Sequence, residues 1–259
     1  MTAVPEIQKE LQVDGETLCR YLEWDSEFFG FRIARIEKIH LSTQDLLSIL
    51  AWCRQERIDC LYFLAESSDS ESIWLAEDYK FHLADVRVTL ERKVDPEIAG
   101  METNSTFGIR PAQASDLDVL RHIAGTSIQE TRFYFDRRFP RERCDQLYQT
   151  WIEVSMKGYA DAVLVAEAGV KPIGFITCKV GNLHVGQIGL LGVRPGWEGK
   201  GIGVALVNAG LHWFAGRDME RVIVITQGRN IPAQRLYQRC GFLISVTQLW
   251  YHRWFDVKY

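Results

Sequence analysis

A glycine-rich segment near residue 200 has the residue types and spacing of an anion-binding loop. Gly199, Gly201 and Gly203 alternate where apolar residues begin to recur with the period of a helix. Such a loop can turn several backbone N–H groups toward one point, and the positive end of the helix dipole adds to their attraction for an anion. Lys200 adds a full positive charge. The pattern predicts a site for the pyrophosphate of a nucleotide-like cofactor.

Two other glycine-rich loops fit these residues less well. A P-loop needs Ser or Thr after Gly-Lys to hold magnesium, whereas Gly201 follows Lys200 here. A Rossmann fingerprint needs a third glycine five positions after the first, and Leu206 stands there when the count starts at Gly201. A plain turn from strand to helix needs only one glycine, so three alternating glycines indicate more than a turn.

The segment around this loop resembles the GNAT superfamily of N-acetyltransferases. The residues that carry the likeness are Val-Arg-Pro at 193–195, Gly-Ile-Gly at 201–203, Asn230, Leu-Tyr at 236–237 and Gly-Phe at 241–242. Their order and separation match the superfamily, and the resemblance covers roughly residues 107–255. It implies an α/β protein with a mixed, mostly antiparallel central sheet flanked by helices.

The resemblance implies acetyl-CoA as the cofactor. Its pyrophosphate would lie on the glycine loop, and its pantetheine arm would pair with the end of the preceding strand as an added strand does. The implied cofactor-binding residues are Leu191, Gly192, Val193, Glu198, Gly199, Lys200, Gly201, Ile202, Gly203 and Asn230. Asn230 is equally suited to be a plain N-cap residue. Glu198 departs from the family, which has Arg or Gln there, so its carboxylate is expected to face away from the phosphates.

Acetyl transfer to an amine needs a neutral amine, a donor for the tetrahedral oxyanion and an acid for the leaving thiolate. A backbone N–H near residues 191–193 can serve the oxyanion. The resemblance assigns the acid to Tyr237, whose phenol has an unperturbed pKa near 10 and is protonated at neutral pH. The competing interpretation of Tyr237 is a core aromatic beside Leu236.

Short motifs in both halves of the chain indicate which class of amine accepts the acetyl group. Trp24 with Phe-Phe-Gly at 28–30, Thr-Arg-Phe at 131–133, and Tyr148 with Trp-Ile at 151–152 resemble GNAT enzymes that acetylate the 4-amino group of TDP-4-amino-4,6-dideoxygalactose. Arg132 could pair bidentately with a substrate phosphate and Phe133 could stack on a base or sugar, or both could lie in a surface loop that folds over the core. The phenylalanines at 28, 29 and 31 are expected at a buried hairpin edge.

The resemblance places a carboxylate base near the end of the N-terminal half, and the matching residue is Asp85. Asp85 could instead be an exposed strand residue paired with Arg87. The reading with the most support is acetyl transfer to the amine of a nucleotide-linked deoxyamino sugar. Alternatives are another acceptor, such as a protein N-terminus, a polyamine or an antibiotic, or a non-catalytic acetyl-CoA sensor.

The chain divides into two parts near a polar stretch at residues 95–106. We expect a smaller N-terminal α/β domain at 1–98 that contributes to the acceptor site, and an acetyltransferase domain at 106–259. No internal repeat stands out. Strands are expected at residues 20–23, 31–39, 60–65, 81–92, 108–111, 163–166, 173–180, 185–191, 222–226 and 248–255, and helices at 42–57, at 70–77 capped by Ser70, after a cap at Ser115, after Gly203 and after Asn230.

Composition excludes several classes of protein. The 259 residues carry a net charge of -4, which gives no support to binding nucleic acid. There is no apolar run long enough to span a membrane and no secretory signal. The six cysteines form no CxxC pair, which favours reduced thiols in the cytoplasm, and no metal-binding pattern occurs. The expected partner is a small-molecule substrate; an aromatic strand near residues 250–255 could join a homodimer or pack internally.

Overall fold

The chain forms two compact units in the computed structural model, which describes residues 9–95 and 107–255. The described part of the first unit comprises residues 9–87, 135–140 and 247–255, and the rest belongs to the second. Most of the expected linker at 95–106 lies outside the described residues. The expected domains at 1–98 and 106–259 stay a prediction.

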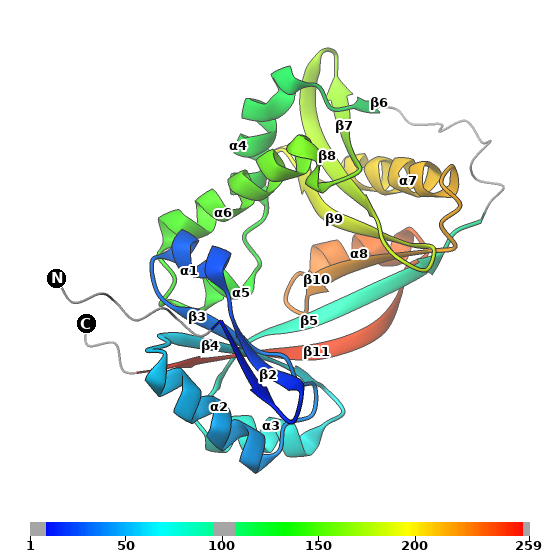
Figure 1. Cartoon of the computed structure of the whole chain (residues 1–259). Helices are drawn as coiled ribbons and strands as arrows, with labels where there is room; N and C mark the ends of the chain where they lie inside the picture. Colours follow the sequence, from blue (N-terminus) through cyan, green and yellow to red (C-terminus); the bar gives the residue numbers. More distant parts are fainter. Residues whose placement is uncertain (1–8, 96–106, 256–259) are drawn as a thin grey trace. The chain divides into compact units, whose positions relative to one another are not determined.

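The first unit is a mixed sheet with helices (Figure 1). Its elements are β1 (Glu10–Val13), β2 (Glu16–Tyr21), α1 (Glu23–Phe29), β3 (Ile33–Ile36), α2 (Thr43–Gln55), β4 (Cys60–Glu66), α3 (Ser70–Asp78), β5 (His82–Lys93) and β11 (Leu243–Trp254), the last two strands having residues in both units. Within the unit the strand order is β1-β2-β3-β4-β11-β5. β3 and β4 are parallel, while β1 with β2, β2 with β3 and β4 with β11 are antiparallel. Its core includes Leu46 and Ile49 of α2 packed with Leu61 and Phe63 of β4.

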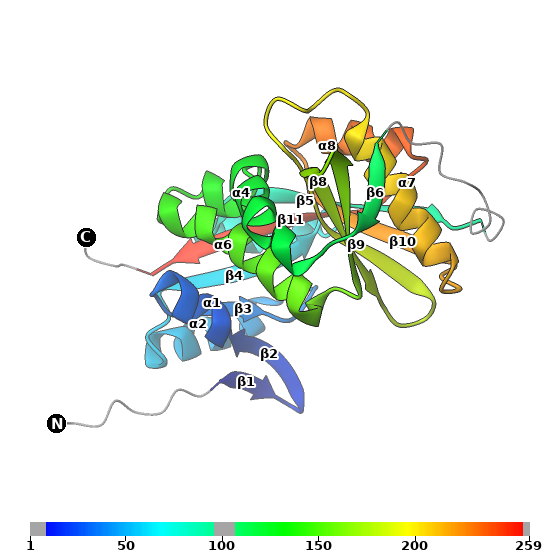
Figure 2. The ribbon, with the colours of Figure 1, turned by 90° about the horizontal axis from the view of Figure 1, so that it is seen from above.

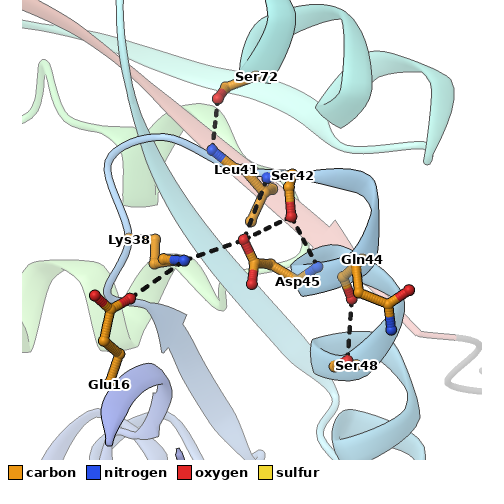
Figure 3. A network of polar contacts seen from close by, with 8 residues as sticks. All are labelled: Glu16, Lys38, Leu41, Ser42, Gln44, Asp45, Ser48 and Ser72. Carbon is orange, nitrogen blue, oxygen red and sulfur yellow. Dashed lines mark hydrogen bonds and ion pairs between the residues drawn. The ribbon is translucent and has the colours of Figure 1, made fainter. Parts of the chain in front are cut away.

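Local polar chemistry fixes the start of α2. The Ser42 hydroxyl accepts the Asp45 backbone N–H at 3.1 Å, and the Asp45 carboxylate accepts the Ser42 N–H at 3.4 Å, so the two form a capping box (Figure 3). Lys38 lies 3.2 Å from the same carboxylate and 3.3 Å from that of Glu16. The start of α2 therefore carries both a side-chain cap and a carboxylate that belongs to the helix itself.

Two expectations for this unit are wrong. The segment at residues 23–29 is a helix, not part of a hairpin edge, and Gly30 ends it in the left-handed conformation at φ 81°. Trp24 and Phe28, four residues apart, stack with ring centroids 5.0 Å apart, which is helical spacing. In addition, Asp69 and not Ser70 caps α3, because the Asp69 carboxylate accepts the Ser72 N–H at 3.1 Å.

The second unit has the sheet order β11-β5-β10-β9-β8-β7-β6. Its further elements are β6 (Gly108–Pro111), the 3-10 turn η2 (Ala114–Asp116), α4 (Leu117–Ser127), α5 (Arg132–Phe135), α6 (Arg141–Val154), the π-helical turn η3 (Ser155–Tyr159), β7 (Ala162–Ala168), β8 (Lys171–Val180), β9 (Val185–Val193), α7 (Ile202–Ala215), β10 (Arg221–Gln227) and α8 (Ile231–Arg239). The pairs β6–β7, β7–β8 and β8–β9 are antiparallel, and β9–β10 is parallel. The expected mixed, mostly antiparallel sheet flanked by helices is confirmed.

Helices α4 and α7 cover opposite faces of this sheet (Figures 1 and 2). Gly174 of β8 faces Ile202 and Leu206 of α7, whereas Gly192 of β9 faces Ile123 and Ser127 of α4. The expected cap at Ser115 is wrong: η2 precedes α4, and Gln113 and Asp116 form its capping box. Asp116 also pairs with Arg110 at 2.7 Å.

The two units share one topology that the sequence did not reveal. In each, three antiparallel strands lead through a helix to a strand parallel to the third, and then through a second helix to a long strand. In the first unit these are β1, β2, β3, α2, β4, α3 and β5; in the second they are β7, β8, β9, α7, β10, α8 and β11. By this correspondence, α2 in the first unit is the counterpart of α7.

Candidate active site

The loop before α7 exposes a set of backbone N–H groups. Gly196, Gly199 and Gly201 have φ values of 84°, 74° and 87°, where side chains other than hydrogen are disfavoured. Gly201 is the N-cap of α7 and supplies no side-chain cap. Three backbone N–H groups in the first turn of α7 have no hydrogen-bond partner, within the helix or elsewhere in residues 9–95 and 107–255. They belong to Ile202, Gly203 and Val204. The helix begins with free donors at its positive end.

Gly203 serves a different purpose from the other two glycines of the predicted trio. Its φ is not in the left-handed region. A β-carbon at Gly203 would lie 3.0 Å from Leu236 Cδ2, so glycine here lets α8 approach the first turn of α7. Tyr237 is the next residue of α8 after Leu236.

The two charged residues of the loop are both engaged. The Glu198 carboxylate accepts the Gly196 N–H at 2.7 Å, so it folds back on the start of the loop. The Lys200 ammonium lies 4.5 Å from the centroid of the Trp197 ring, a cation–π contact. Both side chains therefore have partners within the loop itself.

The strands β9 and β10 stop pairing before either ends. Their parallel register runs only to Ile188 and Val224, although β9 continues to Val193 and β10 to Gln227. A bulge accompanies the separation: Ile188 pairs with Cys178 and Leu191 with Ile176, so two β9 residues face Thr177. The Thr177 hydroxyl accepts the Leu190 N–H at 2.7 Å. The end of β9 is thus left with an unpaired edge toward β10.

Tyr237 is buried on α8, with its ring centroid 5.8 Å from that of Phe242. Burial raises the pKa of the Tyr237 phenol above its ordinary value. Its hydroxyl has no hydrogen-bond partner within the described ranges. The phenol is therefore protonated at neutral pH, and its hydroxyl is available as a hydrogen-bond donor.

A comparison with known sequence families identifies the part of the chain that holds these features. The acetyltransferase (GNAT) family matches residues 127–242. The chain contains an acetyltransferase domain of the GNAT family. Enzymes of this family use acetyl-CoA.

Similar proteins extend the likeness beyond residues 127–242. The chain is 26% identical to dTDP-fucosamine acetyltransferase of Escherichia coli O6:H1 over 238 residues, which cover 90% of this chain and 96% of that one. It is 26% identical to the spore coat polysaccharide biosynthesis protein SpsD of Bacillus subtilis over 153 residues, 59% of this chain and about half, 53%, of SpsD. A GCN5-related N-acetyltransferase structure from Sphaerobacter thermophilus has the same fold, with a TM-score of 0.64, 15% identity, and coverage of 96% of this chain and 83% of the other.

Asn230 of this acetyltransferase is a true N-cap. Its side-chain oxygen accepts the Ala233 N–H at 3.1 Å, while Gln234 donates to the backbone oxygens of Gln227 and Gly228 at 2.9 Å each. The capping interpretation is confirmed, and it does not conflict with a further contact to the pantetheine arm, which stays a prediction.

The predicted acceptor residues have different surroundings from those expected. Arg132 and Phe133 belong to the short helix α5, not to a loop, and the Arg132 guanidinium lies 4.4 Å from the centroid of the Phe133 ring. Phe133 is buried. Asp85 lies on β5 in the first unit and is 2% exposed, so the expectation of an exposed strand residue is wrong. Its carboxylate accepts the Val86 N–H at 2.9 Å.

The described residues contain no group of three or more His, Cys, Asp or Glu side chains suited to a metal ion. Nor does any helix in the same ranges have the length and apolar character needed to cross a bilayer.

Proposed function

We propose that the chain transfers the acetyl group of acetyl-CoA to the amino group of a nucleotide-linked deoxyamino sugar. The observation that carries the acetyl-CoA part is the separation of β9 from β10 beside the uncapped start of α7. Pantetheine would extend β9 at residues 191–193, and the diphosphate would accept hydrogen bonds from the loop at 198–203. Asn230 would reach the pantetheine arm.

The relatives support the acceptor class. One is named for dTDP-fucosamine and matches nearly its full length, and the other is named for polysaccharide biosynthesis. Both names point to sugar chemistry. We infer that Arg132 pairs with a phosphate of the sugar nucleotide and that Phe133, beneath its guanidinium, holds the arginine plane in position.

The proposed reaction is direct attack of the amine on the thioester carbonyl. A C–N bond forms, the carbonyl oxygen takes negative charge and accepts a backbone N–H of β9, and the C–S bond then breaks. Tyr237 donates its hydrogen bond to the leaving sulfur. Because burial also disfavours the tyrosinate, the phenol stabilises the thiolate chiefly as a hydrogen-bond donor. The proton that CoA finally carries comes from the positively charged nitrogen of the tetrahedral intermediate, which loses it as the neutral amide forms, so the phenol regains any proton it passes to the sulfur.

We further propose Asp85 as the base that keeps the attacking amine neutral. Asp85 is 2% exposed, and a carboxylate is a side chain that can accept a proton from an ammonium group. All six cysteines are buried and none forms a disulfide, which supports a reaction in the reducing cytoplasm.

The test is release of CoA measured across a panel of nucleotide-linked aminosugars, with peptides and polyamines as other acceptors. The proposal expects turnover with at least one nucleotide sugar and little with the others. A preference for a peptide or polyamine would overturn the acceptor class and leave acetyl transfer standing, whereas CoA binding without turnover of any amine would identify a sensor.

Arg132→Ala tests the phosphate contact. We expect the KM for the nucleotide sugar to rise at least about ten-fold, because a charge-assisted hydrogen bond contributes about 1.5–3 kcal/mol. Arg217→Ala is the matched control, since Arg217 also stacks on a neighbouring ring, 3.8 Å from the Trp213 centroid. An unchanged KM in Arg132→Ala would remove Arg132 from the acceptor site.

A further inference from the structure

The last residue of α4 meets the open end of β9. A β-carbon built on Gly192 would lie 2.7 Å from Phe175 Cε1, 2.9 Å from Ser127 Oγ and 3.1 Å from Ile123 Cγ2. Only glycine can stand at position 192, and the Ser127 hydroxyl lies directly over it. Gly192 belongs to the stretch of β9 that extends past the last pair with β10.

The Ser127 hydroxyl, unlike those of Thr126 and Ser155, makes no hydrogen bond to the backbone of its own helix. Thr126 donates to the His122 backbone oxygen at 2.7 Å, and Ser155 donates to that of Trp151 at 2.7 Å, as such residues commonly do. Ser127 makes no hydrogen bond within residues 9–95 and 107–255, and its side chain is exposed. It is open to a ligand at this end of the strand.

The face of the sheet on which Ser127 lies determines which side of a bound thioester its hydroxyl can approach. A thioester that extends β9 lies in the plane of the sheet, so its carbonyl oxygen points along that plane toward a backbone N–H. The two faces of the carbonyl carbon are then the two faces of the sheet. Helix α7, with the diphosphate loop at its start, covers one face through Ile202, and α4 covers the other. A nucleophile adds perpendicular to the carbonyl plane, and the face without the diphosphate loop is the one that Ser127 borders.

We propose that Ser127 positions the attacking amine. Its Oγ accepts one N–H of the neutral amine, which directs the nitrogen lone pair at the carbonyl carbon. Ser127 forms no covalent bond and takes no proton in this step. The inference rests on the proposed function for the location of the thioester, but it holds for any amine acceptor and so does not depend on the sugar.

The experiment compares Ser127→Ala with wild type for the best amine of the panel. We expect kcat to fall about 10- to 100-fold, in line with the cost of a misplaced reactant. The Kd for acetyl-CoA from calorimetry should be unchanged, because Ser127 lies on the face opposite the cofactor helix. Ser127→Thr, which keeps a hydroxyl, should recover most of kcat, and Thr126→Ala should behave as wild type.

The outcomes separate the two proposals. A wild-type kcat in Ser127→Ala, or a loss in Ser127→Ala that Ser127→Thr fails to restore while its melting temperature is normal, overturns the role of Ser127 alone. Activity with a peptide or polyamine but with no nucleotide sugar overturns the acceptor class, and Ser127 is then measured with the amine that reacts. Wild-type protein that acetylates no amine overturns both.

Discussion

At the scale of single residues, Tyr237 combines burial with a hydroxyl that has no partner in the described part of the chain. Since the hydroxyl makes no hydrogen bond there, Tyr237→Phe should change the free energy of unfolding little. The substitution should mainly remove the hydrogen-bond donor to the leaving sulfur. We expect kcat to fall about 10²- to 10⁴-fold, the usual contribution of an acid of this kind. Steady-state CoA release measures the loss, and calorimetry should give an unchanged Kd for acetyl-CoA. Turnover equal to wild type would exclude Tyr237 as the acid.

Glu198 brings a negative charge into a loop proposed to hold a diphosphate. Its carboxylate accepts the Gly196 N–H, and a glutamine oxygen can accept the same hydrogen bond without the charge. Glu198→Gln should therefore keep the loop intact and strengthen acetyl-CoA binding about two- to five-fold at low salt, with less effect at high salt because surface charges are screened. Weaker binding in this variant would mean that the carboxylate itself contacts the cofactor.

At the scale of elements, the start of α7 depends on glycine conformation. Gly201→Ala introduces a side chain at φ 87° and should destabilise the protein by about 1–2 kcal/mol. It should also raise the Kd for acetyl-CoA at least ten-fold, because the amides no longer converge. Gly169→Ala is the matched control: Gly169 also has a left-handed φ, 65°, with open space around it, in the turn from β7 to β8. It should lower the melting temperature similarly and leave the Kd unchanged.

Elements with a strong periodic pattern were predictable, and those set by tertiary context were not. The strand at 108–111 and the helix after Gly203 were predicted correctly, since alternation and helical spacing are local properties. Helix α1 was not, because its aromatic residues are also typical of strands. The glycine loop was found from its spacing, whereas Ser127 carries no local signal: its nearness to Gly192 arises only when α4 packs on β9.

At the scale of the whole molecule, buried thiol and phenol groups make the free energy of unfolding depend on pH in the alkaline range. Burial raises the pKa of both Cys178 and Tyr251 to about 12, and raises those of Tyr237 and Tyr134 as well. Above pH 8.5–10, the ordinary range for these groups, the unfolded chain loses protons that the folded chain keeps. The free energy of unfolding should then fall as pH rises, by at most about 1.4 kcal/mol per pH unit for each group.

Urea unfolding under reducing conditions at pH 8, 9, 10 and 10.5 measures this decline. Tyr251→Phe should flatten the curve above pH 10, apart from any constant loss due to the missing hydrogen bond to Glu77 at 3.1 Å. A free energy of unfolding that stays level up to pH 10.5 would contradict the expectation.

The shared topology of the two units raises the question of how many acetyl-CoA molecules one chain binds. Helix α7 starts with glycines and no side-chain cap, whereas its counterpart α2 starts with the capping box of Ser42 and Asp45, and a carboxylate at that end disfavours a second anion. Calorimetry should therefore give one acetyl-CoA per chain. Two equivalents would show that the first unit also binds it.

The capping box of α2 also has a consequence for how the rate depends on acetyl-CoA concentration. With acetyl-CoA bound only at the start of α7, as we propose, a chain has no second molecule of the donor to cooperate or compete with. The rate at fixed amine should follow a simple hyperbola in acetyl-CoA concentration, with a Hill coefficient of about 1 and no inhibition by excess donor through the duplicate fold.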